Sequence, residues 1–142
     1  MKNKLYTAIG LMSGTSMDGV DVSLIRSNGI DQFINVLDEF YEFKGPLRQQ
    51  LIDLRNLILN EDDLKKYTNK LNELEREITL FHGKIVNQIA TKYKEHIDFV
   101  GFHGQTIFHD SKKKISIQLG DGNLLSQLVK KKVIYDFRQE DL

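Results

Sequence analysis

A short segment near the N-terminus combines the residue types that bind phosphate. It reads GLMSGTSMDGVD from Gly10 and lies between two apolar runs. Gly, Ser and Thr in a tight turn present backbone N–H groups and hydroxyls to a phosphate. Mg²⁺ binds carboxylate and phosphate oxygens together, so Asp18 and Asp21 are candidates to contact a Mg²⁺ ion bound to the phosphates. The segment predicts a phosphate-binding hairpin, with a purely structural hairpin as the alternative.

The segment is not a P-loop. Gly14 and Gly19 have a suitable spacing, but Val20 and Asp21 follow them. A P-loop requires Lys and Ser or Thr at those positions, to reach the phosphates and the magnesium. The flanking runs also indicate a strand on each side, whereas a P-loop leads from a strand into a helix.

A second polar segment, HGQT over 103–106, follows an apolar run that predicts a buried strand over 97–102. Open sheets bind ligands at the carboxyl ends of their strands, and His, Gln and Thr offer donors and acceptors to a polyhydroxylated ligand. His103 and His109 are six residues apart, which is not a recognised metal-ligand spacing, so we expect no metal there. The alternative is a polar loop with one packed histidine.

Two further polar segments are 118–123 (QLGDGN) and 136–138 (DFR). The glycines of the first permit close backbone approach, and either Asp121 or Asn123 is suited to cap a following helix. Arg138 is suited to clamp a carboxylate with two parallel hydrogen bonds. Pairing with an acidic neighbour at the surface is the alternative for Arg138.

The remaining sequence predicts the elements that position these segments. Apolar and alternating runs joined by tight turns predict three strands that form an antiparallel meander, over 5–12, 20–26 and 33–43. Pro46 begins a helix with apolar residues at three- and four-residue spacing up to Ile58, and one long helix carries the same stripe from Leu64 to Ile89. Strands at 97–102, 115–119 and 132–137 follow, with a short helix at 124–129.

Composition limits the class of protein. The chain has 142 residues, 20 Lys and Arg against 20 Asp and Glu, and no cysteine. Disulfides and thiolate metal sites are therefore excluded, and the neutral balance argues against a nucleic-acid partner. No apolar run approaches the roughly 18 residues that span a bilayer, and the N-terminus lacks a signal-peptide pattern. We expect no membrane partner and a cytoplasmic location.

The polar segments together resemble a known family. The strings IGLMSGTSMDGVD, GFHGQTIFH, IQLGDGNLL and YDFRQED occur in the order and spacing of the N-terminal part of anhydro-N-acetylmuramic acid kinase. The resemblance runs from Ile9 to Asp141 and is weakest over 31–95, where only the helical pattern agrees. It implies an α/β fold for 1–142: a ribonuclease H-like domain of the actin-like ATPase superfamily. Its mixed sheet would open with a three-stranded antiparallel meander and carry helices packed on it.

The resemblance also implies an activity. Members of the family use ATP and water to open the 1,6-anhydro ring of anhydro-N-acetylmuramic acid and to phosphorylate its 6-hydroxyl, in the recycling of cell-wall sugars. The implied cofactors are ATP and Mg, with Asp18 near the metal. The implied ATP-binding residues are Gly14, Thr15, Ser16, Met17, Asp18, Gly19, Val20 and Asp21. The implied sugar-binding residues are His103, Gly104, Gln105, Thr106, Asp136 and Arg138, the last reaching the lactyl carboxylate.

The chain departs from the family in length, since a full member is more than twice as long. The resemblance implies that the family's Asp-Thr-Gly-Pro-Gly-Asn segment, whose Asp is the catalytic base, lies beyond Leu142, and so does the second nucleotide-binding half. No catalytic residue is therefore assigned in this chain. We expect it to be inactive alone, and to pair with a chain carrying the C-terminal half or with copies of itself.

A non-catalytic function is the alternative. The stripe over 64–89 has a spacing compatible with a coiled-coil seam, which would make the chain a module that self-associates through this helix. In the kinase interpretation the same stripe packs on the sheet.

Overall fold

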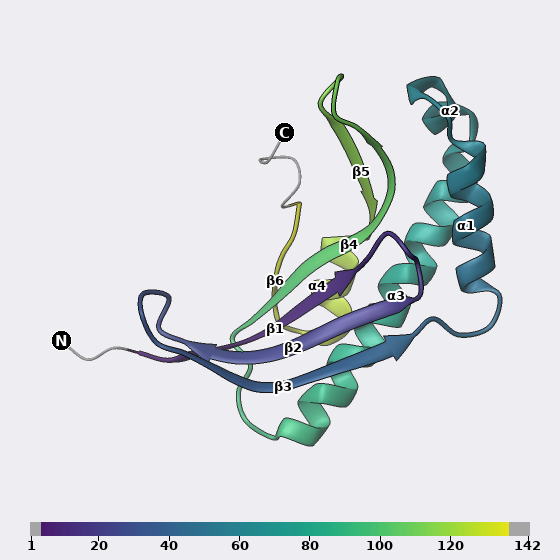
Figure 1. Ribbon diagram of the computed structural model, residues 1–142. Coiled ribbons are helices and arrows are strands. Elements are labelled where there is room, and N and C mark those ends of the chain that lie inside the picture. The colour runs from purple at the N-terminus through teal and green to yellow at the C-terminus, as the bar shows by residue number, and fades with distance from the viewer. Residues whose placement is uncertain (1–3, 137–142) are drawn as a thin grey trace.

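The fold consists of one sheet with helices packed against it (Figure 1). A computed structural model describes residues 4–136 of the chain. In chain order the elements are β1 (Tyr6–Ser13), β2 (Gly19–Ser27), β3 (Phe33–Glu42), α1 (Leu47–Leu57), α2 (Glu61–Lys66), α3 (Thr68–Tyr93), β4 (Phe99–Asp110), β5 (Ile115–Leu119), α4 (Gly122–Val129) and β6 (Lys132–Ile134).

The sheet has the order β3-β2-β1-β4-β5, and β6 also pairs with β4. Strands β1, β2 and β3 form an antiparallel meander. Strand β4 runs parallel to β1, so the intervening helices form the crossover between them. A mixed sheet that begins with a meander and carries helices confirms the predicted fold class.

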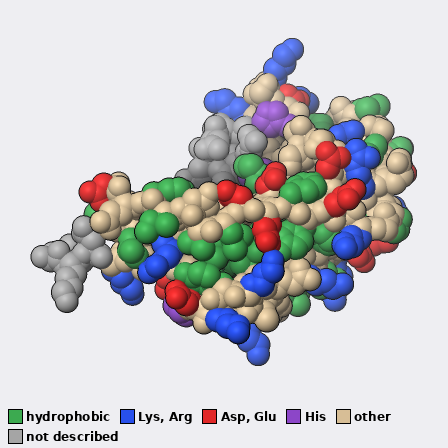
Figure 2. All heavy atoms as spheres, turned by 60° about the horizontal axis from the view of Figure 1, so that its bottom comes forward, with side chains coloured by type: hydrophobic (Ala, Val, Ile, Leu, Met, Phe, Trp, Pro, Cys, Tyr) green, Lys and Arg blue, Asp and Glu red, His purple; other side chains and the backbone are tan. Residues whose placement is uncertain are grey.

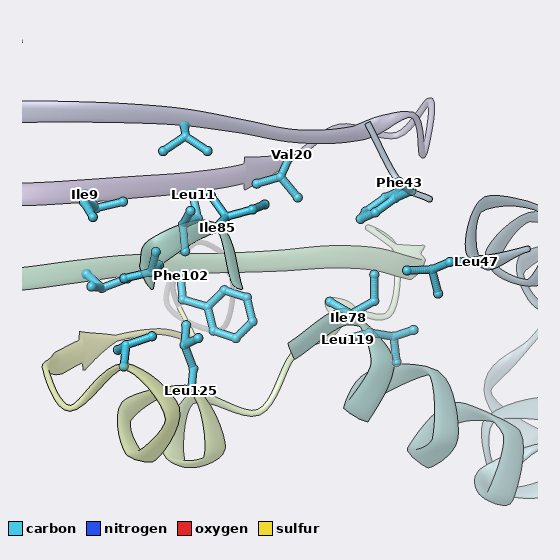
Figure 3. Close-up of a cluster of buried hydrophobic side chains, with 14 of the residues drawn as sticks. Ile9, Leu11, Val20, Phe43, Leu47, Ile78, Ile85, Phe102, Leu119 and Leu125 are labelled. Atoms are coloured by element: carbon cyan, nitrogen blue, oxygen red, sulfur yellow. The ribbon is translucent and has the colours of Figure 1, made fainter. Parts of the chain in front are cut away.

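The core lies between the sheet and the helices α1, α3 and α4 (Figure 3). Alternate residues of β1, Ile9 and Leu11, point into it, because successive side chains of a strand face opposite sides. From the other side Ile78 and Ile85 of α3 enter the same core. The apolar stripe of α3 is thus buried inside the chain, as the kinase interpretation predicts.

The predicted long helix is divided at Tyr67, whose backbone (φ −105°, ψ 24°) leaves the helical region. Helix α2 begins with a capping box in which Asn60 and Asp63 bond each other's backbone N–H groups. None of its residues is fully buried. Leu64 packs against the core while partly exposed, and the fully buried part of the stripe lies in α3. Two helices therefore replace the one that periodicity predicts.

Strand β4 extends beyond its predicted end at Phe102 and includes the whole HGQT segment. The prediction of a loop there is wrong because the strand exchanges partners instead of ending. Its parallel pairing with β1 ends at Ser13 and Gln105, and its antiparallel pairing with β5 begins with Gln105 and Leu119.

The surface combines charged and hydrophobic side chains. Figure 2 shows green hydrophobic groups interspersed with acidic and basic ones on the face turned to the viewer. The exposed large hydrophobic residues include Phe33, Ile34 and Phe40 of the edge strand β3. No helix among residues 4–136 is long and apolar enough to cross a membrane.

Candidate functional site

The candidate phosphate-binding segment, residues 10–21, includes the tight turn of the β1–β2 hairpin. The N–H of Met17 donates to the carbonyl of Gly14 at 3.2 Å, which closes a turn over 14–17. Met17 has a positive φ of 59°, and its side chain is fully buried in the core. The side chain of Met17 therefore anchors the turn, while Gly14, Thr15 and Ser16 are exposed.

The residues after the turn belong to β2. A Cβ at Gly19 would overlap the backbone of Tyr41 on β3, so this position excludes every side chain. Val20 is fully buried, and Asp21 pairs with Met12 within the sheet. The predicted segment thus divides into a turn over 14–18, exposed except at Met17, and a strand portion over 19–21.

Three successive carbonyls of the turn accept hydrogen bonds from distant side chains. Gln105 Nε2 donates to the Gly14 carbonyl at 3.0 Å, and Arg55 Nη1 donates to the Thr15 carbonyl at 3.0 Å. Arg48 Nη2 lies 3.4 Å from the Ser16 carbonyl. These donors lie on β4 and α1, so two separate elements hold the turn by its carbonyl side.

Holding the carbonyls also orients the amides. In a planar trans peptide the C=O of one residue and the N–H of the next point in opposite directions. Fixing the carbonyls of Gly14 and Thr15 toward the protein therefore directs the N–H groups of Thr15 and Ser16 away from it. Successive outward N–H groups in a turn form an anion-binding concavity.

Asp18 is the acidic residue of the turn over 14–18. Its Oδ1 lies 3.0 Å from Arg48 Nε, with 53% of the Asp18 side chain and 46% of the Arg48 side chain exposed. Its backbone carbonyl accepts from the Phe43 N–H at 2.9 Å, which ties the turn to the end of β3.

The donor set at the turn fits magnesium only together with phosphate. Within residues 4–136, no group of three or more His, Cys, Asp or Glu side chains could hold a metal ion. Mg²⁺ keeps several waters and commonly uses one or two carboxylates plus substrate phosphates. Asp18 meets that requirement, and Asp21 lies in β2 rather than in the turn.

Part of the predicted sugar-binding set lies around a small cavity at the junction of β4, β5 and β6. His103, Gly104 and Asp136 line it. Phe102, Gln118, Gly120 and Tyr135 complete the lining. The structure thus brings together residues of three polar segments, 103–106, 118–123 and 136–138.

Two of the sequence-based expectations fall outside the described residues. Arg138, the residue expected to reach the lactyl carboxylate, lies in the C-terminal stretch that the structure does not describe. Leu142, beyond which the resemblance implies the catalytic Asp, also lies outside the described residues. The carboxylate clamp and the place of the catalytic base therefore stay predictions.

Gln105 and Thr106 point elsewhere. Gln105 is fully buried, and its Nε2 bonds the Gly14 carbonyl of the turn over 14–18. Its Oε1 and the Oγ of Ser13, its register partner on β1, are buried without a hydrogen-bond partner in the described part of the chain. Thr106 Oγ1 accepts from Gln118 Nε2 on β5 at 3.2 Å. Gln105 therefore connects strand β4 to the turn over 14–18 from within the core and does not face a ligand.

Sequence reasoning missed four residues that position these segments. Arg48 and Arg55 are two of them. The others are Glu75 and Thr79 of α3, which accept hydrogen bonds from the Gly120 and Asp121 N–H groups at 3.2 and 3.0 Å. Polar positions on an amphipathic helix normally indicate its solvent-exposed face. The only signal available in the sequence was the seven-residue spacing of the two arginines, which puts them on one side of α1.

Comparison with known proteins identifies the family. The family described as anhydro-N-acetylmuramic acid kinase matches residues 6–142. The chain belongs to this family. Proteins named anhydro-N-acetylmuramic acid kinase match it from Pelagibacter ubique (52% identical over 139 residues), Rhizobium etli (39% over 144) and Brucella canis (35% over 145).

These matches cover 96–98% of the chain but only 37–38% of each relative. The chain thus corresponds to the N-terminal part of the kinase. The family is a family of sugar kinases with the actin-like ATPase fold, which agrees with the mixed sheet.

Proposed function

We propose that this chain supplies the phosphate-binding turn and part of the sugar site of a kinase that uses ATP to open and 6-phosphorylate 1,6-anhydro-N-acetylmuramic acid. The observation that carries the proposal is the turn over 14–18, whose Gly14 and Thr15 carbonyls accept from β4 and α1, an arrangement that directs the N–H groups of Thr15 and Ser16 outward. Membership of the kinase family supports the substrate class.

In this proposal the turn binds the phosphates of ATP. The N–H groups of Thr15 and Ser16 and the hydroxyls of both residues donate to phosphate oxygens. Gly19 lets β2 lie close to β3 directly after the turn, because any side chain there would push the two strands apart. Asp18 would hold a hydrated Mg²⁺ ion, which when bound would supply positive charge to offset that of the phosphates.

The sugar lies against the cavity lined by His103, Gly104 and Asp136. His103 and Asp136 offer a donor and an acceptor to its hydroxyl and acetamido groups. Arg138 pairs with the lactyl carboxylate. Gln105 acts beneath them by fixing the turn relative to β4, so that the phosphates and the sugar hydroxyl keep one geometry. Proximity and orientation of this kind account for most of the catalysis in phosphoryl transfer.

The location and assembly follow from the substrates. We propose a cytoplasmic protein, since ATP is available there. Its cleft is completed either by a chain that carries the remaining part of the kinase or by a second copy of this chain.

Titration with Mg·ATP tests the phosphate turn. We expect the backbone amide signals of residues 14–18 to shift in an NMR spectrum of the labelled chain, because weak binding is visible there. Asp18→Asn lowers the affinity in the presence of Mg²⁺, and the matched control Asp62→Asn on the exposed surface of α2 leaves it unchanged. Equal affinities for the wild type and Asp18→Asn would remove Asp18 from the site.

Turnover is tested separately. We expect the 142-residue chain, incubated with ATP, Mg²⁺ and the anhydro-sugar, to yield no phosphorylated sugar by mass spectrometry. Transfer needs both substrates and the metal to be positioned together, and this chain corresponds to 37–38% of its relatives. Formation of the 6-phosphate would show that these residues are sufficient.

A further inference from the structure

We propose that helix α1 is a working part of the nucleotide site: Arg55 positions the phosphate turn, and Arg48 pairs with Asp18 until Mg²⁺ and nucleotide displace it. This inference rests on the proposed phosphate-binding function of the turn. It assigns to each arginine an effect of opposite sign on ligand binding.

Helix α1 is a rigid support for both side chains. Its residues Leu51 and Leu54 are 0% and 1% exposed, so the helix is fixed to the core. Arg48 and Arg55 lie seven residues apart, close to two helical turns, and therefore project from one side of α1. Both guanidinium groups reach the same hairpin end.

Arg55 makes one contact with the turn, from Nη1 to the Thr15 carbonyl. This bond sets the plane of the peptide between Thr15 and Ser16 and so directs the Ser16 N–H outward. Gln105 does the same for the preceding peptide. With Arg55 removed, the Thr15–Ser16 peptide is free to rotate, and one phosphate donor is no longer preorganised.

Arg48 differs because its principal partner is a carboxylate. Arg48 Nε lies 3.0 Å from Asp18 Oδ1, whereas Nη2 lies 3.4 Å from the Ser16 carbonyl. The ion pair is half exposed, and pairs of this kind are weak and exchange readily. Arg48 and a hydrated Mg²⁺ compete for the same carboxylate. Loss of Arg48 therefore makes Asp18 more available to the metal.

The experiment compares Arg55→Met, Arg48→Met and the control Arg76→Met, whose side chain is exposed on α3. ATP affinity is measured over a series of Mg²⁺ concentrations by NMR titration, and thermal stability is measured alongside. Arg55→Met weakens ATP binding about tenfold at every Mg²⁺ concentration. Arg48→Met lowers the Mg²⁺ concentration needed for half-saturation by up to about fivefold. Arg76→Met changes neither quantity.

Two further variants separate these effects from a loss of folding. Arg55→Lys keeps a charged donor without the planar guanidinium and binds ATP with intermediate affinity. In an Asp18→Asn background the effect of Arg48→Met disappears, because the competition requires the carboxylate. A purely structural α1 would instead give parallel losses of melting temperature and affinity in both arginine variants.

The outcomes distinguish this inference from the proposed function. If the wild-type turn amides fail to shift with Mg·ATP, the proposed function fails and the role of α1 fails with it. If the wild type binds but Arg55→Met binds equally well, or Arg48→Met needs more Mg²⁺, only the role of α1 is overturned.

Discussion

The surrounding fold imposes a positive φ on Met17 and Gly104 and lowers the pKa of His82. Met17 takes a left-handed backbone conformation, with φ of 59°, which costs a non-glycine residue roughly 1–2 kcal/mol. Its fully buried side chain offsets that cost, because burying a Met side chain contributes about 1.5–3 kcal/mol. The turn is thus fixed by the Met17 side chain in the core and by the Arg48 and Arg55 side chains of α1.

Gly104 tests how strongly the HGQT segment is constrained. Its φ is +81°, and a Cβ would meet the carbonyl oxygen of Leu119. We expect Gly104→Ala to lower the free energy of unfolding by about 1–3 kcal/mol in urea denaturation. Gly10→Ala is the matched control, because nothing lies within 4 Å of the Cβ it would add. Similar midpoints for the two variants would contradict the strain at Gly104.

His82 gives the fold a defined pH dependence. It is fully buried, and that burial lowers its pKa from 6.5 to about 4. Its Nδ1 lies 2.7 Å from the Ile78 carbonyl, and its ring packs on Phe102 with centroids 4.8 Å apart. Between pH 6.5 and 4 the unfolded chain takes up a proton at this site that the folded chain does not. Stability contributed by a neutral His82 is therefore present above pH 6.5 and lost as the pH falls toward 4.

We expect this residue to reduce the free energy of unfolding by about 2 kcal/mol between pH 7 and pH 5. The measurement is urea denaturation at both pH values for the wild type and His82→Leu, whose loss over this range is correspondingly smaller. His96→Gln serves as the control, since its imidazole is 83% exposed. Parallel losses in the wild type and His82→Leu would assign the pH dependence to other groups.

At the scale of elements, a substitution in helix α3 tests whether its apolar stripe packs in the core of the chain or mediates self-association. Leu74 is 1% exposed and belongs to the core. We expect Leu74→Glu to destabilise the chain by about 3–5 kcal/mol, because it buries an unpaired charge. Loss of the far-UV circular dichroism of the folded monomer would show this. Asn72→Glu, at an exposed position of α3, keeps the fold.

The opposite result would support the self-associating module. In that case Leu74→Glu remains folded and size-exclusion chromatography shows an oligomer converted to a monomer. The burial of Leu74 and Ile78 within one chain argues for unfolding instead.

At the scale of the whole molecule, we expect local stability to fall from the centre of the sheet to its periphery. Ile9 on β1 pairs with Leu24 of β2 on one side and Val100 of β4 on the other. Helix α2, in contrast, has no buried residue. We expect hydrogen exchange to be slowest for backbone amides around Ile9 and Val100, and fastest among the helices for Glu61–Lys66, because exchange follows the free energy of local opening. Equal protection of α2 and β1 would contradict this gradient.

The sequence by itself determined several of the elements, the turn segment and the family. An apolar run placed β1, and alternation placed β2 and β5, within a residue of their observed ends. Pro46 with the leucine stripe located α1. These features are local, because side-chain periodicity and turn residues act over a few neighbouring positions. The linked strings from Ile9 to Asp141 indicated the kinase family that the comparisons confirmed.

The tertiary structure alone decided how those segments work together. The donors that bond the carbonyls of the 14–18 turn come from residues 32, 40 and 91 positions away, on α1 and β4. Strand β4 continues through HGQT because β5 replaces β1 as its partner, which no local pattern signals. The burial of Gln105 and His82 likewise depends on which elements pack against them. Local sequence sets backbone preference, whereas burial and hydrogen-bond partners are set by contacts between segments distant in the chain.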